Sequence, residues 1–132
     1  LRRAYTRSKF SLREYQDPAA DYSGNRLTGV PKGSITSSVD MQFPKGFYFF
    51  LQHNFTSRIP LNDANAVFAD KYNIVQSRIG WRTLKFNKAT LVDNLFDEKY
   101  SLGNDLNAAG NRYFNAAATR NFYGGVAYRF NK

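Results

Sequence analysis

Apolar and polar residues alternate with a period of two in several stretches of the chain. Between positions 34 and 43, Ile35, Val39 and Met41 fall on one face of an extended strand, and polar residues occupy the positions between them. After Pro44-Lys45-Gly46 the alternation resumes over positions 47–56. Two alternating segments joined by a Pro/Gly turn predict a β-hairpin.

Four further segments complete a prediction of six strands. Three of them cover residues 4–14, 72–82 and 122–130. The fourth follows a tight turn at about 85–88 and runs to about Phe96. The strand before Phe96 is compatible with two assignments of its faces, and the sequence does not choose between them. No segment keeps the 3.6-residue repeat of an amphipathic helix for more than about a turn.

The predicted connections alternate in length. Residues 16–31, 60–70 and 101–119 are long and rich in Asn, Asp, Gly, Pro or Ala, whereas 44–46 and 85–88 are short. Strands of about 9–11 residues with tight turns on one side and long loops on the other are typical of membrane β-barrels. No internal repeat or linker divides residues 1–132, so we expect one domain.

Composition narrows the class of protein. The 22 aromatic residues (17%) argue against disorder, the absence of cysteine excludes disulfide scaffolds, and a single histidine, His53, excludes His-cluster metal sites. The net charge of +9 indicates an anionic partner, which could be a nucleic acid, a lipid headgroup layer or an anionic solute. We find no run of 18 apolar residues and no signal peptide, and the charged start suggests a chain cut from something longer.

The alternation alone leaves open which face meets water. In a soluble sheet the apolar face points inward, whereas in an outer-membrane barrel it points to lipid and the polar face lines the lumen. Aromatic rings near the strand ends and a strongly polar opposite face, with Asp40, Gln52, Gln76 and Arg78, favour the membrane. Six strands cannot close a well-packed membrane barrel, so this interpretation requires a larger barrel of which the chain is a part.

Three motifs resemble those of TonB-dependent outer-membrane receptors of the siderophore receptor family. Residues 93–100 read DNLFDEKY and resemble the NLFD-K-Y signature near the end of these receptors. Residues 24–32 resemble the G-x-x-L-x-x-V-P-K segment that enters an earlier strand, and 120–130 resemble the closing strand. The motif positions matched in the first of these are Asn94, Leu95, Phe96, Asp97 and Tyr100.

The resemblance implies an all-β fold: an antiparallel transmembrane β-barrel segment that forms about six C-terminal strands of a 22-stranded barrel in the outer membrane of Gram-negative bacteria. It implies transport of a ferric siderophore or similar metal chelate. The implied partners are the rest of the barrel, an N-terminal plug, the TonB complex through the plug, and outer-membrane lipid. The loops at 16–31, 60–70 and 101–119 would then face outward and the tight turns would face the periplasm.

The closing strand has a second implied role, in folding. By the same resemblance, its alternating residues Phe122, Val126, Tyr128 and Phe130 form the signal that the barrel-assembly machinery reads. Two features depart from the family pattern: Asn131-Lys132 follow the terminal aromatic residue, and Gly33 stands where His often follows Pro-Lys.

Few residues are candidates for chemistry. Arg78, Arg82 and Arg129 alternate with apolar positions and are candidate basic residues of the lumen, where they would attract anionic chelates or pair with carboxylates of the plug or wall. We interpret His53 as a lipid-side ring at the membrane interface. The sequence offers no catalytic constellation, cofactor motif or metal site, so we expect no enzyme.

Two other classes compete with a transport protein. A soluble small β-barrel that binds a fatty acid or another apolar ligand would suit the length and charge, but it predicts an apolar interior and a helical lid. A nucleic-acid binder ranks last, because the basic residues are spread over all strands and loops and form no single stripe.

Overall fold

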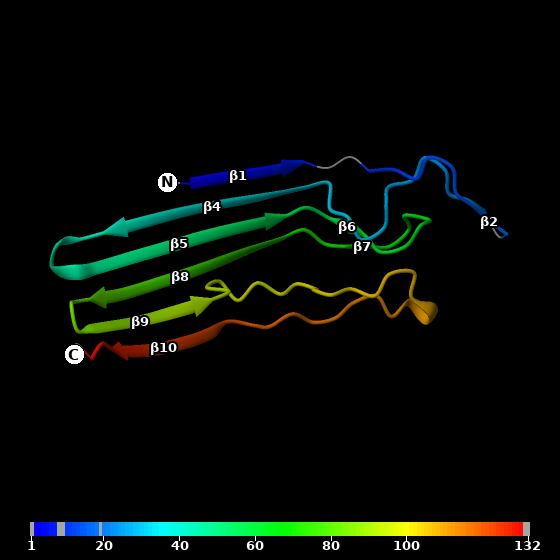
Figure 1. The fold of residues 1–132 in the computed structure, drawn as a ribbon. Helices are drawn as coiled ribbons and strands as arrows, with labels where there is room; N and C mark the ends of the chain where they lie inside the picture. The colour runs from blue at the N-terminus through cyan, green and yellow to red at the C-terminus, as the bar shows by residue number, and fades with distance from the viewer. Residues whose placement is uncertain (1, 8–9, 19, 131–132) are drawn as a thin grey trace.

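The computed structural model describes residues 2–7, 10–18 and 20–130 and shows an antiparallel all-β chain (Figure 1). One six-stranded sheet has the order β1-β4-β5-β8-β9-β10. Its strands are β1 (Arg2–Arg7), β4 (Gly33–Gln42), β5 (Phe47–Thr56), β8 (Tyr72–Arg82), β9 (Phe86–Asp93) and β10 (Asn121–Tyr128). Two of the long connections each contain a pair of antiparallel two-residue strands: β2 (Gln16–Asp17) with β3 (Ala20–Asp21), and β6 (Ile59–Pro60) with β7 (Phe68–Ala69). Short 3-10 turns cover Pro44–Gly46 and Ala109–Asn111.

Within the described residues, no helix has the length and apolar character needed to cross a membrane.

The predicted hairpin around residues 44–46 is confirmed. Val39 of β4 pairs with Leu51 of β5, so the apolar residues of the two strands lie on one face. The turn is tight because Lys45 and Gly46 both adopt positive φ, at 64° and 87°. The predicted strand at 72–82 is confirmed as β8.

The second tight turn was predicted at the wrong place. Phe86 already begins β9, and the turn lies over residues 83–85. Thr83 closes it: its backbone N donates to the Phe86 carbonyl at 2.7 Å, and its Oγ1 accepts from the Phe86 N at 3.0 Å. Leu84 is 88% exposed at the tip, and an apolar residue there hides the turn in the hydropathy pattern.

Three predicted strand ends also differ from the structure. The strand expected to reach about Phe96 stops at Asp93, because Asn94 turns the chain with a φ of 50°. The first strand ends at Arg7 instead of residue 14, and residues 8–9 lie outside the described part. Leu12 is no longer in the sheet: its backbone N donates to the carbonyl of Asn25, in the following connection, at 2.8 Å. The last strand ends at Tyr128, two residues before the predicted Phe130.

The pairing register settles the faces of β9. Thr90 lies opposite Ile79 of β8 and Gly124 of β10, whereas Leu91 lies opposite Arg78 and Tyr123. One face of the sheet, here called the apolar face, therefore includes Phe49, Leu51, Val75, Ile79, Trp81, Val92, Phe122 and Val126. The other, here called the polar face, includes Thr36, Asp40, Gln42, Tyr48, Gln52, Asn54, Gln76, Arg78, Arg82, Asn87 and Asp93.

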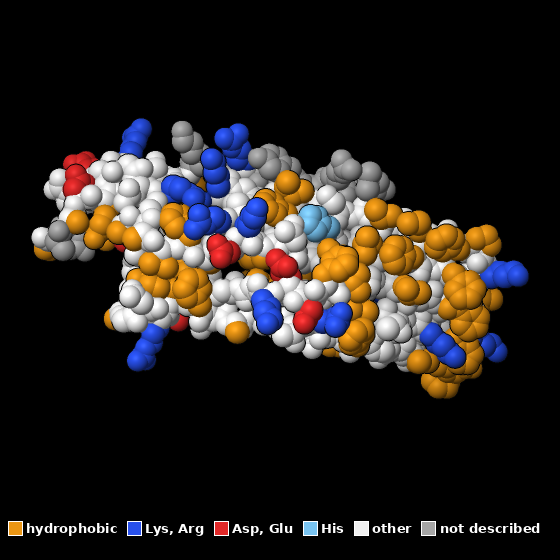
Figure 2. Space-filling model, turned by 180° about the vertical axis from the view of Figure 1, so that it is seen from behind, with side chains coloured by type: hydrophobic (Ala, Val, Ile, Leu, Met, Phe, Trp, Pro, Cys, Tyr) orange, Lys and Arg blue, Asp and Glu red, His pale blue; other side chains and the backbone are white. Residues whose placement is uncertain are grey.

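The apolar face is not covered by other parts of the described chain. Phe122 and Val126 are 69% and 70% exposed, and hydrophobic side chains gather over the turn-end half of the sheet (Figure 2). Each described edge strand, β1 and β10, pairs on one side only, and the two lie at opposite edges in Figure 1. A small closed barrel with an apolar interior, the soluble alternative, is therefore contradicted.

Burial is concentrated in the long connections at the other end of the sheet. Leu61, Ala69 and Tyr113 form a small core that joins the β5–β8 and β9–β10 connections. The backbone N of Gly29 donates to the Pro60 carbonyl at 2.8 Å, and that of Asn107 donates to the Leu61 carbonyl at 2.9 Å. The connections between β1 and β4, β5 and β8, and β9 and β10 thus pack into one folded unit.

Candidate functional site

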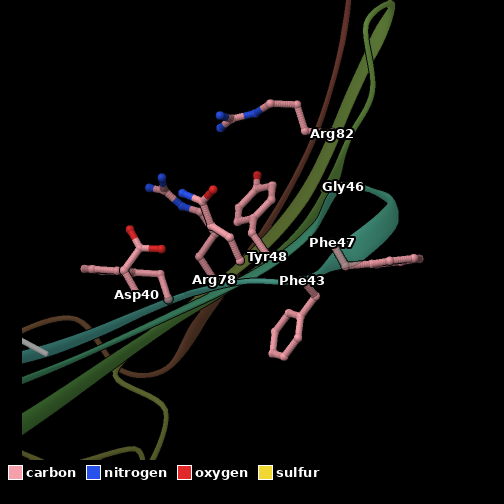
Figure 3. Close-up of a pocket in the computed structure, with 9 residues that line it drawn as sticks. Asp40, Phe43, Gly46, Phe47, Tyr48, Arg78 and Arg82 are labelled. Atoms are coloured by element: carbon pink, nitrogen blue, oxygen red, sulfur yellow. The ribbon is translucent and has the colours of Figure 1, made fainter.

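The polar face carries a hollow of about 520 Å³ near the tight turns (Figure 3). Strands β4, β5 and β8, together with the first turn, supply its lining: Asp40, Gln42, Phe43, Gly46, Phe47, Tyr48, Phe50, Arg78 and Arg82. Asp40, Tyr48, Arg78 and Arg82 point to the same side of the sheet, while the Phe43 and Phe47 rings point away from them. The hollow is thus a charged surface with an aromatic residue at its centre.

The pairing register brings these side chains together. Phe50 pairs with both Asp40 and Arg78, so the carboxyl and the guanidinium flank one residue of β5. Two residues nearer the turn, Tyr48 pairs with Gly80, and the Arg82 guanidinium lies over the Tyr48 ring, 5.2 Å from its centroid. Among the residues that the structure describes, neither arginine forms an ion pair. The hollow holds two positive charges against one negative charge and is suited to an anionic group.

Gly80 determines how Tyr48 lies. A Cβ atom at Gly80 would be 2.2 Å from Cζ of the Tyr48 ring, so the ring lies flat across the glycine. The Tyr48 hydroxyl then reaches β9 and donates to Oδ1 of Asn87 at 3.2 Å. Tyr48 is therefore a fixed surface on which Arg82 is placed.

We expect Gly80→Ala to displace the Tyr48 ring and to lower the free energy of unfolding by about 1–3 kcal/mol. The double variant Gly80→Ala/Tyr48→Ala should lose less than the sum of the two single variants, because the second substitution removes the clash. Urea titrations of the folded barrel in micelles measure this coupling. Strictly additive losses would contradict the proposed contact.

The structure brings together only two of the three predicted lumen arginines. Arg78 and Arg82 share the hollow. They are an even number of residues apart on one strand, so their side chains lie on the same face. Arg129 follows β10 outside the hollow, and its backbone N donates to the Lys85 carbonyl at 2.8 Å. Asp40 and Tyr48 were not predicted as site residues, because their relation to Arg78 and Arg82 depends on the pairing of β5 with β4 and β8.

The NLFD segment is placed as a turn that ends β9. Asn94 is 2% exposed; its Nδ2 donates to the Glu98 carbonyl at 2.8 Å and its Oδ1 accepts from the Glu98 N at 2.8 Å. Leu95 donates its N–H to the Val75 carbonyl at 2.8 Å, and Oδ1 of Asp97 accepts from the Arg120 N at 2.9 Å. The segment thus holds both ends of the last long connection to the sheet, while the Phe96 ring is exposed.

Tyr100 closes the same region. Its ring lies 4.7 Å from that of Tyr72, measured between centroids. Burial, followed by the negative charge of Asp93, raises the pKa of the Tyr100 hydroxyl above its usual value. Tyr100 is therefore held neutral and has a packing role at the loop end of the sheet.

His53 lies on the apolar face, where it pairs in register with Val75 of β8. Its Nε2 is 3.0 Å from Oδ1 of Asn73. Among the described residues, no group of three or more His, Asp or Glu side chains could hold a metal ion. The closing-strand residues Phe122, Val126, Tyr128 and Phe130 are all exposed on the uncovered side of the sheet.

The fold is similar to that of solved iron receptors. The siderophore receptor PiuA from Acinetobacter baumannii matches 87% of this chain at a TM-score of 0.71 and 16% identity. The ferric citrate transporter FecA matches 80% at 0.67 and 22% identity. The ferric yersiniabactin uptake receptor FyuA from Yersinia pestis matches 80% at 0.59 and 28% identity. No family model matches the sequence.

These matches define the class: the fold is that of an antiparallel outer-membrane β-barrel wall, which confirms the predicted fold class and location. They also confirm the resemblance to TonB-dependent siderophore receptors, since that is the class of the proteins matched. The names of all three proteins describe receptors or transporters and none an enzyme, in line with the sequence prediction. The chain spans 17–18% of the length of these three proteins.

Proposed function

We propose that this chain forms the last strands of the barrel wall, with their extracellular loops, in a TonB-dependent receptor that transports a ferric siderophore or similar metal chelate. The observation that carries the proposal is the uncovered, two-faced sheet. An apolar face that the described residues leave uncovered suits lipid, and a polar face with two arginines that pair with no described carboxylate suits a water-filled lumen. Earlier strands complete such a barrel, because open sheet edges do not occur in hydrocarbon. An N-terminal plug fills its lumen.

The hollow with Arg78 and Arg82 faces the lumen in this arrangement. Its excess positive charge suits a carboxylate of the plug or an anionic chelate that passes between plug and wall. The TonB complex acts through the plug, and the barrel-assembly machinery reads the closing strand with Phe122, Val126, Tyr128 and Phe130. The folded long connections form the outward surface.

Uptake of radioactive iron tests the proposal. Iron-starved cells that carry the complete receptor should take up at least one chelate from a panel of ferric catecholates, hydroxamates and carboxylates. Cells that lack either the receptor or TonB should not. Unchanged uptake of every chelate after removal of the receptor would reject transport of these chelates.

The double variant Arg78→Gln/Arg82→Gln should lower this uptake several-fold, because it removes both positive charges of the hollow. Arg78→Lys/Arg82→Lys is the matched control: it keeps the charge and should retain most of the uptake. Equal uptake by the Gln variant and the wild type, at equal amounts in the outer membrane, would show that the hollow has no part in transport.

A further inference from the structure

A second hollow, of about 370 Å³, lies near the tight turns where β8, β9 and β10 run side by side. Two rows of residues across these strands account for most of its lining. Ile79, Thr90 and Gly124 form one row, and Trp81, Lys88 and Val126 form the next row toward the turns. Ala89 and Gly125 complete the lining. Thr90 and Gly124 are small residues between larger ones, which makes them the floor.

The described residues do not fill this hollow. A Cβ atom at Gly124 would meet no atom within 4 Å. One wall is held in place, because Nε1 of Trp81 donates to the Lys45 carbonyl at 2.9 Å and the indole packs against Phe47 with ring centroids 6.3 Å apart. The hollow is therefore a shallow, open depression in the apolar face.

Among the described residues, the charged side chains at the turn end of the apolar face are all positive. Lys88 lies within the lining, and Lys45 and Lys85 lie in the two tight turns. Of the acidic residues in the described part of the chain, only Asp40 lies in the turn-end half of the sheet, and it is on the polar face. In Figure 2, blue side chains lie at the turn end beside the hydrophobic ones.

Lys88 has no anionic partner among the described residues. An ammonium group at the border of lipid is favourable when it meets an anion or water, and no carboxylate of the described residues lies within ion-pair distance of it. A groove floored by Thr90 and Gly124 and walled by Ile79, Trp81 and Val126 offers apolar surface next to that charge. A phospholipid carries the two complementary parts, a phosphate joined to acyl chains.

We propose that this hollow binds an anionic phospholipid of the membrane leaflet at the turn end. The Lys88 ammonium pairs with the phosphate, Lys45 and Lys85 add to the positive field, and an acyl chain lies over Thr90 and Gly124. The inference rests on the proposed function to the extent that the apolar face must meet lipid. It adds a lipid site that barrel closure alone does not require.

Native mass spectrometry of the complete receptor tests the site. The receptor is purified in detergent and offered phosphatidylglycerol or phosphatidylcholine with identical acyl chains. We expect several-fold greater retention of phosphatidylglycerol. Lys88→Gln should reduce this preference several-fold, and Gly124→Leu, whose Cβ atom would meet no atom of the described residues within 4 Å, should fill the floor and reduce retention of both lipids.

Lys71→Gln is the matched control, because Lys71 is exposed at the loop end of the sheet and should leave lipid retention unchanged. Glycerol phosphate, which has no acyl chain, should not displace the lipid. Equal retention of the two lipids by the wild type, an unchanged preference in Lys88→Gln, or displacement by glycerol phosphate would overturn the proposal.

Iron uptake separates this failure from that of the proposed function. Lys88→Gln and Gly124→Leu should keep the uptake of the wild type wherever they reach the membrane in equal amount. Loss of the lipid preference with intact uptake would remove the lipid site alone. A receptor that binds the lipid and transports no chelate would remove the proposed function alone.

Discussion

Asn94→Ala should lower the free energy of unfolding of the folded barrel by about 2–4 kcal/mol, because it removes three partly buried hydrogen bonds to the backbone and leaves the positive φ of this position to an alanine. The Asn94 side chain is buried and satisfies both the N–H and the carbonyl of Glu98, and its Nδ2 also lies 3.3 Å from the Ala118 carbonyl. Alanine also tolerates poorly the φ of 50° at this position. Urea titration in micelles, followed by tryptophan fluorescence, measures the loss.

Two controls separate the causes. Asn94→Gly removes the same hydrogen bonds but accepts the positive φ, so it should be more stable than Asn94→Ala by about 1 kcal/mol. Asn73→Ala removes an exposed asparagine whose side chain forms one hydrogen bond within the described residues, with His53, and should change stability by less than about 0.5 kcal/mol. Equal stability of Asn94→Ala and Asn73→Ala would contradict the assigned role of Asn94.

Gly46→Ala should destabilise the first hairpin by about 2–4 kcal/mol, because two unfavourable effects coincide there. Gly46 has a φ of 87°, a region that L side chains rarely adopt. A Cβ atom at this position would also lie 1.9 Å from the backbone carbonyl oxygen of Arg82. A backbone atom cannot rotate away, so either the turn or the end of β8 must move.

Gly24→Ala isolates the effect of backbone conformation. Gly24 has nearly the same φ, 86°, but its Cβ atom would meet nothing within 4 Å. We expect this control to cost about 1 kcal/mol, the strain alone. The difference between the two variants, from urea titrations under identical conditions, gives the cost of the close approach to Arg82. Equal losses would mean that the hairpin turn does not press against β8.

Alternation was sufficient to predict the central strands. In β4, β5 and β8 apolar and polar residues alternate with few exceptions, such as Phe50 and Ile74 on the polar face, and a slip of one residue would exchange the two faces. Pro44 and Gly46 mark their turn unambiguously. The strand from Phe86 lacks this contrast, since Lys88 and Thr90 share a face with Val92, and only its pairing with β8 assigns the sides.

The ends of the outer strands depended on contacts that a linear pattern does not contain. Leu12 leaves the sheet because Asn25, in the middle of the following connection, accepts its N–H. The 83–85 turn depends on the Thr83 hydroxyl and places an apolar residue at the tip, where polar or glycine residues are usual. In both cases a specific hydrogen bond, and not the residue preference of the segment, determines where the strand ends.

The candidate site was predicted in part for the same reason. Arg78 and Arg82 lie on one strand, so their common face follows from the sequence. Asp40 and Tyr48 lie on other strands, and their positions next to these arginines follow only from the register. The glycine at position 80 does not show, from the sequence alone, that the Tyr48 ring occupies the space above it.

The shared core of Leu61, Ala69 and Tyr113 has a consequence for how this end of the protein can vary. Three connections that share a core or exchange backbone hydrogen bonds cannot drift independently in sequence. An insertion beside Leu61 also shifts Gly29 and Asn107, which bond to the carbonyls of Pro60 and Leu61. Variation here is coupled, and the three segments change shape as a set.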